Sequence, residues 1–338
     1  MVSEIQKRQE WNAILARIDN YDCYHTYEYS RINRKLNETP ILLVYEANKV
    51  LIALPLLIRE IPETSFFDCT SVYGYPGPVC SNYAGYEDFE NFQEELKHYF
   101  HQKKIISVFS RLNPFIENQE QAICNLGTIK KLSYVVSIDL TKKTSQQRQL
   151  FSSTTKRYLN RARRLLYVKR METVSSNDLD IFTRMYFENM KRVNARESYF
   201  FEKQYFAEMV TSQEFETELY YAILKENHEI VSAMLIIKSD MGVHYHLSGT
   251  NEMHLYLSPA RLLIDEVRLA HSNSGLNFFN LGGGLGSKKD NLFYFKSSFS
   301  DDYKRFKIWK YIVNEKVYHE LSSQVQNQND GYFPAYRN

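Results

Sequence analysis

The chain has 338 residues, of which 43% are hydrophobic and 24% charged, and its formal net charge is +2. This composition excludes an intrinsically disordered chain and a polycation built for nonspecific nucleic-acid binding, and the length predicts about two domains. The first residues are charged, and no segment approaches the ~20 apolar residues of a membrane span, so we expect a cytoplasmic protein. The cysteines have no CxxC spacing and predict neither a disulfide framework nor a structural metal; they are Cys23, Cys69, Cys80 and Cys124.

Two stretches half a chain apart share one pattern of apolar and polar residues. Residues 44–59, VYEANKVLIALPLLIR, and residues 223–238, ILKENHEIVSAMLIIK, each predict two apolar strands joined by a polar turn. The turns are centred on Asn48 and Asn227, and the stretches are offset by 179 residues. The pattern favours a duplicated domain, against the alternative that two buried hairpins are similar by chance.

Each hairpin has amphipathic helical patterns before it, and strands and a helix after it. Both halves therefore have the order helices, antiparallel hairpin, strand, helix, strand. This order predicts an α+β fold, because a regular parallel array would alternate strands with helices. We expect an N-terminal domain at residues 1–148, a second domain with the main motifs at 149–315, and a C-terminal tail at 316–338 that packs back on the first domain.

A strongly basic helix is predicted between the two halves, in SSTTKRYLNRARRLLYVKR, residues 152–170. Hydroxyl side chains at its start predict a cap, and an apolar stripe predicts that one face packs on a core. Arg157, Arg161 and Arg164 recur at intervals of four and three residues and form a basic face. This face is either an ordinary solvated surface or a rim that binds phosphate, to which guanidinium groups are well matched.

Alternation in VHYHLS predicts a strand with an apolar face of Val243, Tyr245 and Leu247 and a polar face of His244, His246 and Ser248. Two histidines on one face are compatible with a metal site, but no third ligand has a suitable spacing, so we expect none. The imidazoles are either ordinary polar side chains of a half-exposed strand or groups that contact substrate, with His246 as a candidate base.

A helix is predicted to follow this strand. Ser258 is expected to supply a hydroxyl cap, and Pro259 occupies the first helical position. The unpaired amides at the helix start favour a phosphate or carboxylate, to which Arg261 adds a charge. Residues 276–281, LNFFNL, then predict a buried strand.

Four of the chain's 12 glycines lie within five residues directly after that strand, at Gly282, Gly283, Gly284 and Gly286. Glycine is favoured where φ is positive or where another group approaches the backbone closely. The spacing matches neither GxxxxGK[ST] nor GxGxxG, which argues against a generic phosphate loop. The alternatives are a flexible loop and the wall of a cleft.

Four ordered motifs resemble the Fem-type aminoacyltransferases and the related GNAT-like acyltransferases. They are FTRMYFENMKRVNARESYFFEKQYF, SAMLIIKSDMGVHYHLSGT, SPARLLIDEV and FNLGGGLGSKKDNLFYFKSSFS. The likeness is best over residues 152–306, and LPLLIRE and YGYPGP extend it more loosely into the first half. It implies two tandem GNAT-like domains, each a mixed, largely antiparallel sheet flanked by helices. The chain lacks the long heptad-patterned helical insertion that some members associate with tRNA.

The resemblance also implies roles for particular residues. Lys296, in the FK pair after the glycines, corresponds to a lysine that stabilises charge on the reacting carbonyl or on a substrate phosphate. A bound amine can attack directly once a base takes its proton, and candidates for this base or relay are Tyr245, His246 and Tyr199. The substrate-binding residues that we expect are Arg157, Arg161, Arg192, Tyr199, Ser248, Arg261, Asn280, Gly282, Gly283, Gly284 and Phe299.

We therefore expect an acyl or aminoacyl transferase that acts on an amine of a cell-envelope precursor, either a peptidoglycan peptide or a polysaccharide amino sugar. The donor co-substrate is acyl-CoA or aminoacyl-tRNA, and no cofactor is tightly bound. The expected partners are a small-molecule or lipid-linked glycan or peptide acceptor, tRNA in the aminoacyl branch, and a peripheral membrane contact, but not DNA. The alternative is a noncatalytic protein that keeps the duplicated fold and binds a glycan or nucleotide precursor.

Overall fold

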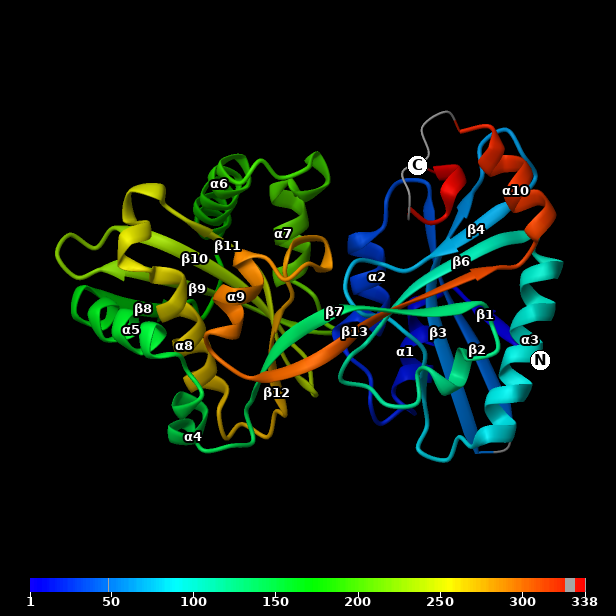
Figure 1. The fold of residues 1–338 in the computed structure, drawn as a ribbon, viewed down its shortest axis with the longest axis horizontal. Helices are drawn as coiled ribbons and strands as arrows, with labels where there is room; N and C mark the ends of the chain where they lie inside the picture. The colour runs from blue at the N-terminus through cyan, green and yellow to red at the C-terminus, as the bar shows by residue number, and fades with distance from the viewer. Residues whose placement is uncertain (48, 326–331, 338) are drawn as a thin grey trace. The chain divides into compact units, whose positions relative to one another are not determined.

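The computed structural model describes residues 1–47, 49–325 and 332–337 (Figure 1). The chain forms two compact units, of which the first comprises residues 1–133 and 305–338 and the second residues 134–304. Two strands pass from one unit into the other: β7 (Thr128–Asp139) begins in the first unit, and β13 (Asp302–Ile312) returns to it. In the described part of the chain, no helix combines the length and the apolar character needed to cross a membrane.

The first unit is a sheet with a helix on each face. Among its described residues the strand order is β1-β2-β3-β4-β6-β13, β5 pairs with β3, and the only parallel pair is β4 with β6. One face packs on α3 and the other on α1, and successive residues of β2 alternate between these two cores. Burial on both faces explains the continuous apolar runs of this hairpin. The elements are β1 (Ser3–Ile5), α1 (Arg8–Leu15), η1 (Cys23–His25), α2 (Tyr27–Asn33), β2 (Glu38–Ala47), β3 (Val50–Glu60), β4 (Phe67–Thr70), β5 (Val79–Cys80), α3 (Tyr86–Gln102), β6 (Ile105–Leu112) and η2 (Gln121–Ile123).

The described C-terminal residues also pack on the first unit, through α10 (Glu315–Ser323) and η6 (Ala335–Arg337). The hydroxyl of Tyr336 donates to the Asp68 carboxylate at 3.1 Å, and the Arg337 guanidinium donates to it at 2.5 Å. Arg59 donates to the other carboxylate oxygen at 2.7 Å. Asp68 is fully buried, so these donors compensate a charge that would otherwise be costly to remove from water.

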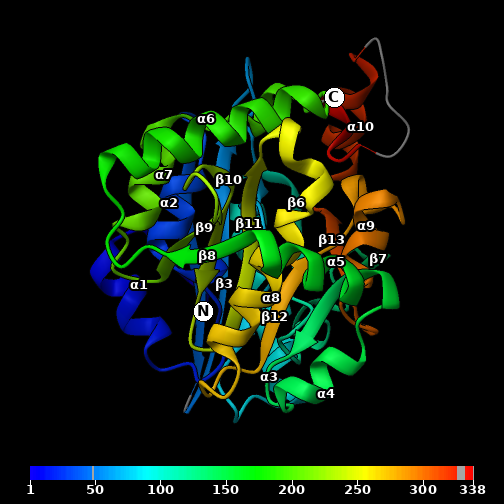
Figure 2. The same ribbon diagram turned by 90° about the vertical axis from the view of Figure 1, so that its left-hand side faces the viewer.

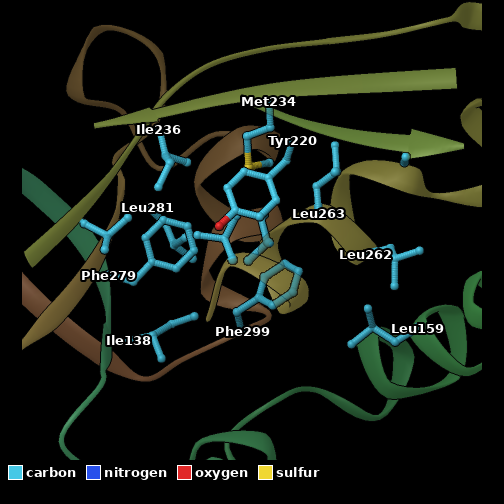
Figure 3. Close-up of a cluster of buried hydrophobic side chains, with 14 of the residues drawn as sticks. Ile138, Leu159, Tyr220, Met234, Ile236, Leu262, Leu263, Phe279, Leu281 and Phe299 are labelled. Atoms are coloured by element: carbon cyan, nitrogen blue, oxygen red, sulfur yellow. The ribbon is translucent and has the colours of Figure 1, made fainter. Parts of the chain in front are cut away.

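The second unit has the strand order β7-β12-β11-β10-β9-β8, with a parallel pair only between β11 and β12. One face of the sheet packs on α5, α8 and α9 around a large apolar cluster (Figure 3). The other face packs on α6 and α7, whose cluster is rich in aromatic rings. The elements are α4 (Thr144–Gln149), α5 (Ser153–Leu165), β8 (Leu166–Arg170), α6 (Ser176–Arg192), η3 (Glu197–Tyr199), α7 (Lys203–Val210), β9 (Glu216–Leu224), β10 (Ile230–Lys238), β11 (Gly242–Thr250), η4 (Glu252–Leu257), α8 (Pro259–His271), β12 (Phe278–Gly282), η5 (Leu285–Ser287) and α9 (Asn291–Ser297).

The element order confirms the predicted α+β fold. The repeated stretches are the antiparallel hairpins β2–β3 and β9–β10, each preceded by two helices and followed by a strand, a helix and a strand that pairs in parallel. Asn227 lies in the turn of the second hairpin, where its Oδ1 accepts from the backbone N–H of Glu229 at 3.1 Å. Asn48, the centre of the first predicted turn, lies outside the described residues.

The starts of α5 and α8 differ in how they are capped. The Ser152 side chain accepts from the N–H of Thr155 at 3.1 Å, as the predicted cap requires. The hydroxyl cap predicted for Ser258 is wrong. Its backbone is left-handed, with φ 54°, because η4 ends directly at this residue, whereas a side-chain cap requires an extended backbone. Pro259 does occupy the start of α8.

Candidate functional site

Lys296 is a buried lysine whose ammonium group faces the glycine run. The side chain is 8% exposed, and its Nζ donates to the carbonyl of Gly283 at 2.8 Å. The same nitrogen lies 5.6 Å from the centre of the Tyr245 ring. Burial lowers the pKa of Lys296 from 10.5 to about 8, while the nearby carboxylate of Asp290 opposes this shift. Lys296 is therefore mostly protonated at pH 7 and titrates close to the physiological range.

The glycine run makes close contacts that a side chain would block. A Cβ on Gly282 would lie 3.1 Å from Lys296 Nζ, and the backbone there has φ +77°, which favours glycine. A Cβ on Gly283 would lie 2.9 Å from the carbonyl oxygen of Tyr134. A Cβ on Gly284 would lie 2.1 Å from the carbonyl oxygen of Lys288. These glycines therefore allow the backbone to fold tightly around the lysine, and a cleft-lining role stays a prediction.

A β-bulge in β11 decides which side chains lie near Lys296. Leu235 pairs with Leu247 and Ile236 pairs with Tyr245, so His246 is the extra residue of the bulge. The predicted regular alternation is therefore wrong beyond Tyr245. The hydroxyls of Tyr245 and Ser248, which alternation places on opposite faces, share a hydrogen bond of 2.5 Å. Burial raises the pKa of Tyr245, so this phenol is neutral near pH 7.

His246 makes its contacts with α7. Its Nε2 is hydrogen-bonded to the hydroxyl of Tyr205 at 2.8 Å, and the two rings stack with centroids 6.1 Å apart. Burial, and then the neighbouring His244, lower the pKa of His246 to about 3. A histidine with this pKa is neutral at pH 7 and is a weak proton acceptor, so the arrangement favours a structural or orienting role over that of a general base.

Asn280 connects the end of β12 to the glycine run. Its side-chain oxygen accepts from the N–H of Gly282 at 2.8 Å, and its amide nitrogen lies 3.2 Å from Nδ1 of His244. Pairing between β11 and β12 covers residues 242–244 and 278–280. Lys296, Tyr245, Ser248, Asn280 and the glycines thus form one connected group at and just beyond the last residues that pair between β11 and β12.

Comparison with known proteins agrees with this fold. Residues 151–305 match the family model described as acetyltransferase (GNAT) domain. These residues form a GNAT-type domain. The crystal structure of FemX matches with a TM-score of 0.71 and 13% identity, over 94% of this chain and 99% of FemX. L-PGS from Bacillus licheniformis matches with a TM-score of 0.57 and 12% identity, over 92% of this chain and 93% of L-PGS.

Another solved structure also has two GNAT domains in tandem. A tandem GNAT protein from the clavulanic acid biosynthesis pathway has a TM-score of 0.50 and 8% identity, over 93% of this chain and 99% of its own. No curated protein matches the sequence. At these identities the solved structures establish the fold. The expected tandem GNAT-like architecture and the Fem-type resemblance are confirmed at that level, and the GNAT-type domain supports the predicted acyltransferase.

The predicted arginines of the GNAT-type domain lie in different surroundings. Arg261 is half-buried, with its guanidinium 4.7 Å from the Phe295 ring and 5.1 Å from the Tyr158 ring. Arg157 and Arg161 lie on the exposed face of α5. In the described chain these three guanidinium groups contact aromatic rings and no carboxylate. Only Arg261 reaches α9, where Phe295 directly precedes Lys296.

The side chains of the remaining predicted residues contact other parts of the GNAT-type domain. The exposed Arg192 is hydrogen-bonded to Asn189 at 2.5 Å, and Tyr199 accepts through its backbone carbonyl from the hydroxyl of Tyr186 at 2.7 Å. Phe299 is fully buried and packs edge-to-face on Phe151 in the core of the GNAT-type domain (Figure 3). The structure does not bring these three side chains into the connected group around Lys296.

Two residues near the site were missed in the sequence. Asp290 caps α9 by accepting from the N–H of Phe293 at 2.9 Å, and its other oxygen accepts from the N–H of Leu285 at 3.0 Å. An aspartate directly before a helix was a usable signal for this role. Tyr205, the partner of His246, had no such signal, because its position in an aromatic-rich helix is equally typical of a core residue.

Proposed function

We propose that this protein transfers an acyl or aminoacyl group from acyl-CoA or aminoacyl-tRNA to an amine of a cell-envelope precursor. The observation that carries the proposal is a buried, mostly protonated Lys296 held next to a glycine run in a GNAT-type domain. The Fem-type and L-PGS folds support the envelope as the setting of the reaction. The cytoplasm, where both donors are made, is the compartment that we propose.

The proposed reaction needs no covalent enzyme intermediate. The acceptor nitrogen attacks the donor carbonyl carbon, the C–S bond of a thioester or the C–O bond of an aminoacyl ester breaks, and the amine proton leaves with a base or with the departing group. The carbonyl oxygen becomes negative on the way. Lys296 has three N–H donors, and its bond to Gly283 uses one of them, so it can donate to this oxygen from a site with little water.

We propose that Arg261 binds a phosphate of the donor. Two aromatic rings hold its guanidinium in place, and no carboxylate neutralises it in the described chain. It lies in the first turn of α8, where the dipole of the helix adds a positive potential. Both proposed donors carry phosphate, so this contact does not discriminate between them.

A screen of donors against acceptors tests the proposal. The full-length chain is incubated with acyl-CoAs of increasing length or with aminoacyl-tRNA, in the presence of peptidoglycan peptide precursors or amino sugars, and products are detected by mass spectrometry. We expect one donor class to acylate one class of amine. If calorimetry shows tight binding of an acceptor but no donor–acceptor pair gives a product, the result would instead indicate the noncatalytic binding protein.

Substitution of Lys296 tests the assigned chemistry. Lys296→Met keeps an unbranched chain in the buried position but removes the charge and the donors, and we expect kcat to fall by about 10²-fold or more. Lys191→Met, on the exposed end of α6, is the matched control and should leave kcat unchanged. A Lys296→Met enzyme with wild-type kcat would exclude the proposed role of this lysine.

A further inference from the structure

One surface of the second unit combines unpaired arginines with exposed apolar side chains. Helix α5 contains five Lys or Arg residues and no Asp or Glu, and one of its arginines, Arg163, is paired with Asp265 and Glu266. The arginines on the outer face of α5 make no ion pair within the described chain. We define the α5–η4 surface as these arginines and the apolar residues of the adjacent η4: Arg157, Arg161, Arg164, Met253, Leu255 and Tyr256.

The short helix η4 is anchored at both ends, and three of its apolar side chains, those of Met253, Leu255 and Tyr256, are exposed. Leu257 at its end is 1% exposed in the core, and Asn251 caps its start by accepting from the N–H of Met253 at 3.0 Å. Side chains three residues apart in a 3-10 helix lie one above the other. Met253 and Tyr256 therefore share a side of η4, and they are 79% and 59% exposed. Leu255 is 40% exposed.

The basic and apolar parts of this surface are continuous. The Arg161 guanidinium lies 5.8 Å from the centre of the Tyr256 ring, which joins α5 to η4 directly. The two elements also lie beside each other in the ribbon, where η4 is yellow and α5 is green (Figure 2). Glu252 is the one acidic residue within α5 and η4. The surface therefore carries a net positive charge around a group of exposed apolar side chains.

We propose that the α5–η4 surface docks the protein on membranes that contain anionic phospholipids. Arginines next to an exposed aromatic ring and aliphatic chains match a lipid interface, where the cations meet headgroup phosphates and the apolar groups enter the acyl boundary. RNA would use the same arginines and stack a base on Tyr256. It would gain little from Met253 and Leu255, which have no planar face or polar group, so the aliphatic side chains favour lipid.

This docking is independent of the proposed reaction, because it requires neither a donor nor Lys296. The phosphate partner predicted for the basic face of α5 is then the lipid headgroup. Each arginine near an anionic surface strengthens binding about fivefold at low salt, and the attraction weakens as salt screens it.

Vesicle co-sedimentation of the full-length protein tests the proposal. We expect binding to vesicles of phosphatidylcholine with 30% phosphatidylglycerol on the order of tenfold tighter than to phosphatidylcholine alone, and weaker in 0.5 M salt. The Met253→Ser/Leu255→Ser variant and the Arg164→Glu variant should each lose at least about fivefold in affinity for the anionic vesicles. Leu36→Ser, at an exposed leucine of the first unit, is the control and should bind like wild type.

The outcomes separate the alternatives. Equal binding by wild type and both variants, or no binding to anionic vesicles, overturns the proposal. Tighter binding to a single-stranded RNA oligomer that is abolished by Arg164→Glu and unaffected by Met253→Ser/Leu255→Ser would assign the surface to RNA. A dimer in solution that these substitutions dissociate would assign it to a second copy of the chain. Because Met253, Leu255 and Arg164 have no role in the proposed chemistry, turnover of a water-soluble acceptor should persist in all variants.

Discussion

The charge state of Lys296 connects burial to the proposed chemistry. Its pKa of about 8 means that the group is protonated below pH 8 and loses its proton above it. A charge-stabilising lysine acts in the protonated form, so we expect kcat at saturating substrate to fall up to about tenfold per pH unit above pH 8. The measurement is a pH–rate profile from pH 6.5 to 9.5.

Lys296→Arg provides the comparison for this profile, because guanidinium stays protonated throughout the range. The kcat of the Lys296→Arg variant should therefore not fall above pH 8. The acceptor amine titrates in both enzymes, so dividing the wild-type kcat by the variant kcat at each pH removes its contribution. A wild-type rate that rises through pH 8 relative to this variant would identify neutral Lys296 as a base, which contradicts the assigned role.

Gly249 lies at a close contact between α6 and β11. A Cβ at this position would lie 2.5 Å from the backbone carbonyl of Met185 and 2.7 Å from the backbone nitrogen of Tyr186. Because these atoms are backbone, α6 must shift to accommodate it, and we expect Gly249→Ala to lower the free energy of unfolding by about 1–3 kcal/mol. Urea denaturation measures the loss. Gly85→Ala is the control, since its Cβ would lie 3.7 Å from its nearest neighbour, and an equal loss in both variants would contradict the packing argument.

At the scale of elements, α5 and α8 are joined by a buried ionic network. One oxygen of Asp265 accepts from Arg268 at 2.6 and 2.8 Å, and the other accepts from Arg163 of α5 at 2.9 Å. Asp265 is fully buried, so its removal leaves cations without compensation in a low-dielectric region.

We therefore expect Asp265→Asn to lower the free energy of unfolding by about 3 kcal/mol, measured by urea denaturation with the m-value monitored. The matched control is Asp180→Asn, which breaks an exposed ion pair with Lys203 at 2.6 Å and should lose less than about 1 kcal/mol. Similar losses in both variants would show that burial does not set the strength of the network.

The elements differ in how well the sequence predicts them. Apolar runs and three-to-four periodicity predict the hairpins β2–β3 and β9–β10 and the helices around them, because burial imposes those patterns on every residue of a face. The bulge at His246 is not predictable in this way. It inserts one residue without changing the composition of the strand, and only the pairing with β10 reveals it.

At the scale of the whole molecule, two strands span the boundaries between the units. Strand β13, the last in the strand order of the first unit, begins in the second unit, and β7, the first in the strand order of the second unit, begins in the first unit. Trp309 of β13 is fully buried in the core of the first unit, with its indole hydrogen-bonded to the carbonyl of Leu126 at 2.5 Å. The first unit is therefore discontinuous in sequence, whereas the sequence repeat predicts a boundary between residues 148 and 149.

Because β7 and β13 cross the unit boundaries, we expect the two units to differ in whether they fold when expressed alone. We expect residues 134–304 expressed alone to unfold cooperatively in urea, because they contain every strand of their sheet except the first half of β7. Residues 1–133 alone should not, because they lack β13 and Trp309. A chain of 1–133 joined by a flexible linker to 305–338 should regain cooperativity. Cooperative unfolding of 1–133 alone would contradict the requirement for β13.

The sequence by itself determined the duplicated α+β plan, the hairpins and the basic face of α5, and it indicated Lys296 and the glycine run as candidate site residues. These features are local patterns or motifs, and each can be recognised within a short stretch of consecutive residues. The tertiary structure decided which side chains surround Lys296, that His246 faces Tyr205, that Phe299 fills the core, and that β7 and β13 cross between the units. These outcomes depend on strand register and on contacts between residues far apart in the chain, which no local pattern encodes.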